Sequence, residues 1–443
     1  METIVALSTP WGRSGVGLVR ISGPRALELS RAVCPGPRPW IERRVTLRRA
    51  VDKTGALIDE VVVSWMKGPK SYTGEDVVEF SAHGNPVILA ALIDALVHVG
   101  ARPARPGEFT RQALMNGRTD LLQVEAISAL ISARSMSGVR DAASAFSGEA
   151  ENFANRLRER LLDVAAELEA RLDHPDDDLS MASDAEVLTV LRSISEESTR
   201  MADSWESSRV RLEGASVALV GPVNAGKSSL FNHLVGTDRA IVSAQPGTTR
   251  DVVERSVLMD GLDVTFLDTA GEGGTSDPIE AAGVVLGRSL SASADLLLLV
   301  LPLDRVLSVS SLELLTRTAN LPRIVVGTFS DVLSDDERIE CDFQVSNLSG
   351  QGLPSLRQHI RERLGTAPTS GEQTVVLSQR QHDLYRSIAE HCDEAASALL
   401  GALGPAVSAS EVVRAIERLG ELMGIDAREA VLDRLFSRFC IGK

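Results

Sequence analysis

The stretch SVALVGPVNAGKSSLFNHLVG (216–236) decides how the middle of this chain folds, because an apolar strand runs into a glycine-rich loop and then into an apolar helix. Residues 221–228 match G-x-x-x-x-G-K-[ST], a pattern that binds the phosphates of a nucleoside triphosphate. Its glycines let successive backbone N–H groups curl around phosphate oxygens at the positive end of the helix. We expect Lys227 to reach the β and γ phosphates and Ser228 to ligate Mg²⁺. The residues predicted to contact the nucleotide here are Asn224, Ala225, Gly226, Lys227, Ser228 and Ser229.

Further apolar runs follow this loop at intervals typical of alternating strands and helices. They are DVTFLD (263–268), DLLLLVL (295–301) and RIVVG (323–327). Short apolar strands separated by helical segments indicate a parallel sheet with crossover helices. We therefore expect residues 215–368 to form an α/β domain built around the phosphate loop.

Two more segments carry groups that a GTPase switch needs. Gly247-Thr248-Thr249 can supply a hydroxyl group to Mg²⁺, and we expect Thr249 to do so together with Ser228. Asp268-Thr269-Ala270-Gly271 follows a strand and offers a carboxylate for the metal shell and a glycine amide for the γ-phosphate. With the phosphate loop, these segments predict a nucleotide-hydrolysing switch.

The segment Thr328-Phe329-Ser330-Asp331 stands where a GTPase reads its base. Guanine presents two adjacent donors, and one carboxylate that accepts both selects guanine over adenine. Asp331 supplies this carboxylate, but Thr328 and Phe329 replace the asparagine and lysine of the usual N-K-x-D. We expect Phe329 to cover the base plane and Ser346 to begin the second base loop. The expectation is guanine preference with weakened affinity, and the alternative is loss of nucleotide discrimination.

The first 120 residues indicate an α+β module. VGLVRIS (16–22) and VVEFSAH (77–83) alternate as strands do, and residues 52–55 predict a hairpin turn. Asn85 and Pro86 predict a helix start, with a capping side chain followed by proline at the first helical position.

Helical sequence lies on both sides of the α/β segment. An apolar stripe along one helix is predicted by Leu157, Leu161, Val164, Leu168 and Leu172. Ser408 and Glu411 predict a capping box that opens the helix VVRAIERLGELM. One helical domain interrupted by an inserted α/β domain explains this order. The predicted domains are 1–120, 121–214 (helical, first part), 215–368 (α/β) and 369–443 (helical, second part).

Composition narrows the class of protein. The chain carries a formal charge of −15, spread unevenly: residues 1–120 hold 16 Lys and Arg against 12 Asp and Glu. A nucleic-acid contact would therefore favour the N-terminal part, although a solvated Arg-rich face explains the charge equally well. No apolar run reaches membrane-spanning length and no signal pattern is present, so we expect a cytoplasmic protein with no membrane contact. The four cysteines predict neither a disulfide framework nor a zinc site.

With these residues in hand, the whole chain resembles the MnmE/TrmE family, the tRNA uridine-5-carboxymethylaminomethyl modification GTPases. The blocks that carry the resemblance are IVALSTPWGRSGVGLVRISG (4–23), SYTGEDVVEFSAHG (71–84), ARPGEFTRQALMNGRTDLLQVEAI (104–127), EARLDHPDDD (169–178), NAGKSSL (224–230), AQPGTTRD (244–251) and FCIGK (439–443). Few other GTPases share more than the middle portion, so the match is specific.

The resemblance implies an N-terminal tetrahydrofolate-binding module similar to aminomethyltransferase domains, a split helical domain and an inserted Ras-like P-loop G domain. It implies a homodimer formed through the N-terminal module. It further implies a heterotetramer with a GidA-type (MnmG) subunit, which binds FAD. In that family the complex adds an aminomethyl-type or carboxymethylaminomethyl group at C5 of the wobble uridine of certain tRNAs. The one-carbon carrier is a 5-formyl- or 5,10-methylene-tetrahydrofolate, and FAD enters only through the partner.

The resemblance also assigns site residues. The folate-contacting positions are Arg20, Glu79, Arg118 and Lys443, with arginine at 118 in place of the usual lysine. The K⁺ ligands are Asn224, Ser243, Gln245 and Thr248. The nucleotide-contacting switch residues are Ser243, Ala244, Gln245, Pro246, Gly247, Thr248 and Thr249. Glu280 matches the residue that orients the attacking water. Cys440 either lies near the transferred carbon or is a small buried hydrophobe.

The sequence thus predicts a K⁺-stimulated GTPase that works in tRNA wobble-uridine modification. A ribosome-assembly GTPase is an alternative that the G domain alone does not exclude, but it predicts neither the N-terminal module nor the terminal CIGK. A nucleotide-sensing scaffold with weak hydrolysis is a second alternative, favoured by the altered base-reading loops.

Overall fold

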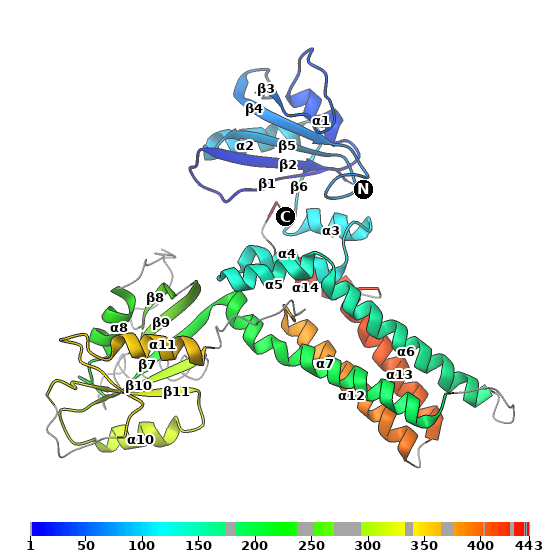
Figure 1. Cartoon of the computed structure of the whole chain (residues 1–443). Coiled ribbons are helices and arrows are strands. Elements are labelled where there is room, and N and C mark those ends of the chain that lie inside the picture. The colour runs from blue at the N-terminus through cyan, green and yellow to red at the C-terminus, as the bar shows by residue number, and fades with distance from the viewer. Residues whose placement is uncertain are drawn as a thin grey trace. The chain divides into compact units, whose positions relative to one another are not determined.

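The computed structural model resolves the chain into two compact units (Figure 1). One unit comprises Met1–Ser128, Phe146–Ser195 and Ser387–Lys443, and the other comprises Ala129–Ala145 and Glu196–Arg386. The structure describes residues 2–173, 182–236, 252–259, 261–269, 294–332, 340–364, 375–401, 404–425, 429–437, 439 and 441–442. Within these ranges, no helix combines the length and the hydropathy that crossing a bilayer requires.

The first unit contains a six-stranded sheet in the order β3-β4-β5-β2-β1-β6. Neighbouring strands are antiparallel except β1 and β6, which are parallel. The elements are β1 (Ile4–Leu7), β2 (Val16–Ser22), α1 (Ala26–Val33), β3 (Thr46–Val51), β4 (Leu57–Met66), β5 (Val77–His83), α2 (Pro86–His98) and β6 (Arg102–Pro103). The strands predicted at 16–22 and 77–83 are confirmed as β2 and β5.

Local signals also placed the turn and the helix start correctly. The Asp52 carboxylate accepts hydrogen bonds from the backbone N–H groups of Thr54 (2.8 Å) and Ala56 (2.9 Å) in the turn between β3 and β4. The Asn85 side chain accepts a bond of 2.9 Å from the N–H of Val87, and Pro86 is the first residue of α2. Both predictions are confirmed.

The two faces of this sheet differ in what covers them. Val19 and Ile21 of β2 are fully buried in a core that α1 and α2 complete. Because side chains alternate along a strand, Arg20 points to the opposite face. Glu79 is its direct partner on β5, so the two side chains share that face.

Helices make up the rest of the first unit. They include α3 (Glu108–Met115), α6 (Glu149–Asp173), α13 (Gly404–Met423) and α14 (Glu429–Phe436). Helix α6 packs along α13, and its predicted stripe is buried at Leu157, Leu161, Val164 and Leu168. Three helices, α4 (Leu121–Ser132), α7 (Asp184–Glu213) and α12 (Gln379–Leu400), contribute residues to both units, and α5 (Met136–Phe146) ends at their boundary.

Two helical predictions were wrong. Leu172 ends the α6 stripe but is 42% exposed, because the packing stops one turn before the helix does. Ser408 and Glu411 do not open a helix, since α13 already begins at Gly404, next to Pro405. Glu411 instead bonds to His391 of α12 at 2.8 Å. A tertiary partner on a neighbouring helix explains the carboxylate better than a cap.

The second unit contains a six-stranded sheet in the order β12-β11-β10-β7-β9-β8. All its neighbours are parallel except β8 and β9, an antiparallel pair at one edge. Its elements are β7 (Ala215–Val220), α8 (Lys227–Gly236), β8 (Val252–Met259), β9 (Leu262–Thr269), β10 (Leu296–Pro302), α10 (Val309–Arg317), β11 (Arg323–Thr328), β12 (Phe343–Gln344) and α11 (Leu353–Arg363).

Strand β10 lies at the centre of this unit, and all seven of its residues are buried. Leu296, Leu298 and Val300 join one core cluster. Leu297, Leu299 and Leu301 join another. The uninterrupted apolar run is therefore that of a strand covered on both faces, as the parallel-sheet prediction requires.

Candidate functional site

The phosphate loop, residues 221–228, joins β7 to α8 and has the backbone that its glycines were expected to allow. Gly226 has φ +81°, and a Cβ atom there would lie 2.9 Å from the side-chain nitrogen of Asn347. At Gly221 a Cβ atom would lie 2.2 Å from the carbonyl oxygen of Val300. Both ends of the loop therefore exclude a side chain. Asn224 at the tip of the loop also has a left-handed backbone, with φ +61°.

Lys227 places a positive charge inside this loop. Its side chain is buried, and its Nζ donates to the carbonyl oxygens of Gly221 and Pro222, at 3.0 Å each. Lys227 is also the first residue of α8, where free N–H groups and the helix dipole favour an anion. Ser228 and Ser229 follow on the exposed side of the helix. The loop thus presents N–H groups, hydroxyl groups and one ammonium group to a phosphate chain.

Asp268 is the penultimate residue of the neighbouring strand β9, at the same edge of the sheet. Its register partner in β7 is Leu219, two residues before the loop begins. Because β7 and β9 are parallel, their carboxyl ends meet at one edge. Thr269 is the last residue of this strand, so the predicted second switch segment begins inside β9 and not after it.

Two tethers join the phosphate loop to the base-reading segments. The hydroxyl group of Thr328 donates to the Ala225 carbonyl oxygen at 2.7 Å, and Thr328 is fully buried. The Asn347 amide donates to the Gly226 carbonyl oxygen at 3.1 Å. Thr328 therefore positions the phosphate loop, although it is a threonine and not the asparagine of the usual N-K-x-D.

A hollow of about 600 Å³ opens beside α8, and we call it the base-side hollow. It is lined by Ser229, Asn232, His233, Phe329, Asp331, Asn347 and Leu348. Phe329 is held at φ +60°, a conformation that costs a bulky residue on the order of 1–3 kcal/mol and that clusters at functional sites. The Phe329 ring and the exposed carboxylate of Asp331 share this hollow, and their task in base reading stays a prediction.

Several lining residues were not predicted as site residues. Asn232 and His233 lie three and four positions after Ser229 on α8, so helical spacing from the phosphate loop could have found them. Asn347 and Leu348 follow Ser346 directly. Ser346 itself is buried, and its hydroxyl group accepts from the N–H groups of Leu348 (3.3 Å) and Ser349 (3.2 Å). It shapes the loop whose next residues line the hollow.

Some predicted residues lie outside the described part of the chain. They are Ser243, Ala244, Gln245, Pro246, Gly247, Thr248, Thr249, Ala270, Gly271, Glu280, Cys440 and Lys443. Their assignments stay predictions.

A second candidate site surrounds Arg20 in the first unit. Its guanidinium group bonds to Oε1 of Glu79 through Nε (2.9 Å) and Nη2 (2.7 Å). The Cζ atom of this group lies 5.5 Å from the centroid of the Tyr72 ring and 5.7 Å from the centroid of the Phe109 ring. The stem of Arg118 lies against Gly74, close to Tyr72 in the chain. Two of the predicted folate residues, Arg20 and Glu79, therefore meet beside the rings of Tyr72 and Phe109.

The end of the chain returns to this site. The Gly442 carbonyl oxygen accepts from the Ser8 hydroxyl (3.1 Å) and from Arg20 Nη1 (3.4 Å). Phe439 packs with Phe436, Val124 and Ile127 in a small core cluster. The terminal residues are thus anchored beside β1 and β2.

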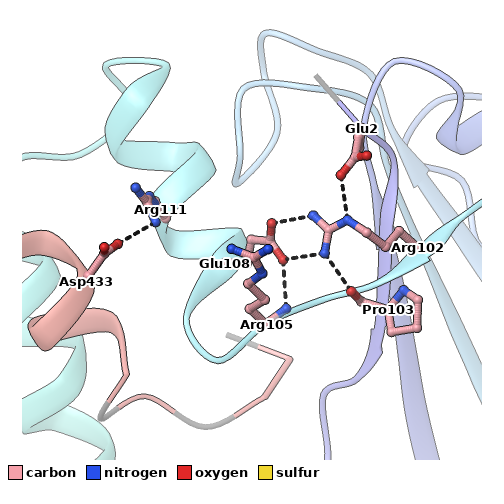
Figure 2. Close-up of polar contacts among 7 residues, drawn as sticks. All are labelled: Glu2, Arg102, Pro103, Arg105, Glu108, Arg111 and Asp433. Atoms are coloured by element: carbon pink, nitrogen blue, oxygen red, sulfur yellow. Dashed lines mark hydrogen bonds and ion pairs between the residues drawn. The ribbon is translucent and has the colours of Figure 1, made fainter. Parts of the chain in front are cut away.

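Helix α3 carries Phe109 and is held at its start and near its middle (Figure 2). At its start, Arg102 of β6 donates to both oxygens of Glu108, at 2.5 and 3.2 Å, and Glu108 also accepts from the N–H of Arg105 at 2.7 Å. Further along, Arg111 donates to Asp433 of α14 at 2.9 Å. These bonds connect the sheet, the aromatic pair and the C-terminal segment.

The substitution Gly442→Ala is expected to release the chain terminus. Gly442 has φ +96°, and a Cβ atom would lie 2.1 Å from the Leu7 carbonyl oxygen, so the tail must move away. Gly148→Ala is the matched control, because Gly148 has the same φ of +96° but no atom within 4 Å of its Cβ position. Carboxypeptidase digestion followed by mass spectrometry should show faster loss of terminal residues only in the Gly442 variant. Equal digestion of both variants would contradict the docked position.

Comparison with known proteins covers the whole chain. Residues 3–118 match the family model described as GTP-binding protein TrmE N-terminus, and residues 121–440 match the model described as MnmE helical domain. The tRNA modification GTPase MnmE of Synechococcus sp. (strain CC9605) is 39% identical over 448 residues, which cover 100% of this chain and 99% of that protein. The protein of that name from Myxococcus xanthus (strain DK1622) is 42% identical over 449 residues, with the same coverage.

Among solved structures, the G domain of the T. maritima FeoB iron transporter is 29% identical to this chain. The match covers 34% of this chain and 98% of that domain. Its TM-score of 0.26 is too low to support a structural argument. The family assignment depends on the family models and the full-length relatives. Their matches extend from the N-terminal sheet through the helices to the terminal segment. The chain belongs to the MnmE family of tRNA modification GTPases.

Proposed function

We propose that this chain binds and hydrolyses GTP and couples hydrolysis to the modification of tRNA. The observation that carries the proposal is the pair of tethers from Thr328 to Ala225 and from Asn347 to Gly226. They connect the phosphate loop to Thr328, next to Phe329, and to Asn347, and both Phe329 and Asn347 line the base-side hollow. A nucleotide with its phosphates along the loop presents its base to Phe329 and Asp331.

Each group in the loop has a task in this reaction. Phosphoryl transfer is catalysed mainly by positioning and by stabilising charge on the phosphate oxygens. Lys227 and the N–H groups of the loop supply positive charge to the β and γ oxygens. Glu280 is proposed to orient the attacking water. Asp331 accepts both donors of guanine, while Phe329 covers the ring.

The described residues fit the two proposed cations. Ser228 offers an exposed hydroxyl group, and Asp268 lies at the end of β9 next to the final residue Thr269, so both present the oxygen ligands that Mg²⁺ prefers. Asn224 offers an exposed amide oxygen at the loop tip for K⁺, with Ser243, Gln245 and Thr248 as its proposed companions. When bound, these ions neutralise charge on the phosphates.

We also propose that the Arg20 site holds a tetrahydrofolate derivative. Folates combine a flat ring that donates hydrogen bonds with an anionic glutamate tail. Tyr72 supplies aromatic surface over the buried ring of Phe109, Glu79 supplies an acceptor, and Arg20 and Arg118 supply positive charge. Lys443 and Cys440 belong to this proposal as the terminal charge and as the residue near the transferred carbon.

The proposed product is a tRNA with an aminomethyl-type or carboxymethylaminomethyl group at C5 of the wobble uridine. The chain would act in the cytoplasm as a homodimer, in a complex with an FAD-binding subunit of the MnmG type. The test is the nucleoside profile of tRNA from a strain that lacks the chain. Loss of the modified wobble uridine, restored by the wild-type gene, supports the proposal, and an unchanged profile rejects it.

GTP turnover in K⁺ and in Na⁺ buffer tests the cation. Faster turnover in K⁺ is expected, because the ion supplies charge beside the phosphates that an arginine finger supplies in other GTPases. Equal rates would reject the K⁺ assignment. Tight GTP binding without turnover in either buffer would favour a nucleotide-sensing scaffold.

A further inference from the structure

The segment from Arg31 to Arg49 is the most positively charged part of the N-terminal sheet. It contains six arginines, Arg31, Arg38, Arg43, Arg44, Arg48 and Arg49, and one acidic residue, Glu42. Its formal charge is therefore +5 in a chain whose total is −15. Arg43 is the arginine that pairs with Glu42, at 3.6 Å.

A cavity of about 250 Å³ lies within this segment. It is lined by Arg31, Cys34, Gly36, Arg38, Pro39 and Trp40. The walls come from the last turn of α1 and from the loop that leads to β3. Arg31 and Arg38 are exposed, so their charged ends are accessible to a ligand.

Arg48 of β3 organises the cavity wall. It is only 6% exposed, and its Nη2 donates to the carbonyl oxygens of Arg38 (3.1 Å) and Pro39 (3.0 Å). Its guanidinium group stacks on the Trp40 ring at 4.0 Å from the centroid. Arg38 in turn donates to the Leu47 carbonyl oxygen at 3.1 Å. The loop is thus fixed in place before any ligand arrives.

The positive charge here is not neutralised within the described part of the chain. No described carboxylate forms an ion pair with Arg31, Arg38 or Arg48. Burial lowers the pKa of Arg48, and the charges of Arg38 and Arg31 lower it further. Burial raises the pKa of the Cys34 thiol to about 12, so Cys34 is neutral at pH 7 and offers no negative charge. An anion in the cavity would relieve this repulsion.

The cavity is separate from the Arg20 site. Arg48 lies two residues before Ala50 in β3, so the two side chains are on the same face of the sheet. This is the face that α1 and α2 cover, because Ala50 belongs to the core beneath these helices. Arg20 points to the opposite face. The sheet itself therefore lies between the two sites.

We propose that this cavity binds a phosphate group of the RNA backbone and that residues 31–49 form a contact surface for tRNA, an inference that rests on the proposed function. Two guanidinium groups around one small cavity match the charge and the geometry of a phosphate. An RNA chain, rather than a free phosphate, also uses the positive charge outside the cavity, where Arg44 is exposed in the same loop. Affinity for a polyanion grows with such accumulated charge.

The test measures tRNA binding to the full-length chain as a function of salt concentration. In the double variant Arg31→Gln, Arg38→Gln, the slope of log K against log salt should fall by about 1, the contribution of one phosphate contact. The control Arg25→Gln, Lys53→Gln removes the same charge from exposed positions of the same sheet unit and should leave the slope unchanged. Thermal melting at the wild-type midpoint shows that both variants are folded, and GTP turnover should stay at the wild-type rate because the phosphate loop belongs to the other unit.

Four outcomes would overturn the inference. They are an unchanged slope in the cavity variant, an equal loss of slope in the control, no measurable tRNA binding by the wild-type chain, and binding of inorganic phosphate that the cavity variant loses while tRNA binding stays intact. The last outcome identifies a site for a small phosphate compound. None of these outcomes decides the proposed function, which is tested separately by the nucleoside profile of tRNA from a strain lacking the chain and by GTP turnover.

Discussion

Replacing Lys227 by methionine is expected to reduce GTP turnover by at least about 100-fold, the scale on which single charge-stabilising groups act in catalysis. Methionine keeps most of the apolar stem but removes the ammonium group that lies among the loop carbonyls of Gly221 and Pro222. Charge that develops on the β and γ oxygens then loses its nearest compensating group. Single-turnover hydrolysis of labelled GTP at saturating protein measures this loss.

A lysine elsewhere provides the control for this change. Lys53→Met removes the same charge from an exposed turn of the N-terminal sheet and should leave turnover at the wild-type rate. Thermal melting of both variants shows whether the Lys227 variant is folded, since this side chain is buried. A folded Lys227 variant that turns over within threefold of wild type would contradict the assignment of the phosphate loop.

Replacing Asp331 by asparagine is expected to weaken GTP binding by roughly 10- to 100-fold, because a hydrogen bond to a charged group contributes about 1.5–3 kcal/mol. A carboxylate accepts from both the N1–H and the amino group of guanine. A carboxamide accepts from only one and places its own NH₂ group against the other. Xanthine has a carbonyl oxygen in place of that amino group, so xanthosine triphosphate should bind the variant better than GTP does.

Competition titrations with GTP, ATP and xanthosine triphosphate measure this change in preference. The control is Asp203→Asn, on the exposed side of α7, where the carboxylate pairs with the exposed Arg386. Exposed pairs of this kind contribute little, so the control should bind all three nucleotides as wild type does. A wild-type chain that binds GTP and ATP equally would show that Thr328 and Phe329 have ended base discrimination. Asp331→Asn would then have no effect.

The parts of the fold that were predicted correctly depend on short-range signals. The β10 run LLLLVL (296–301) is apolar on both faces because the strand is covered on both, and this shows in six consecutive letters. The cap of α2 depends on two adjacent residues, Asn85 and Pro86. The prediction of a capping box at Ser408 and Glu411 was wrong because it used only local sequence. A local pattern cannot reveal that Glu411 already has His391 of another helix as its partner.

The candidate site divides in the same way. Local sequence predicted the loop glycines, Lys227, Ser228 and the carboxylate of Asp331, because the strand, the loop and the helix that hold them are contiguous. Their function as one site depends on Thr328, whose hydroxyl group bonds to a loop 103 positions earlier.

By itself, the sequence determined which chemical groups this protein has and in which local turns they stand, since backbone preference and hydrophobic period act over a few residues. Only the tertiary structure decided which of these groups meet. The Gly442 carbonyl oxygen accepts a hydrogen bond from Ser8, 434 positions away. Arg31 and Arg38 lie close enough to Arg48 for their charges to repel it, and no described acidic residue pairs with these three arginines. Such meetings depend on how sheets and helices pack, and packing brings together residues that no local pattern relates.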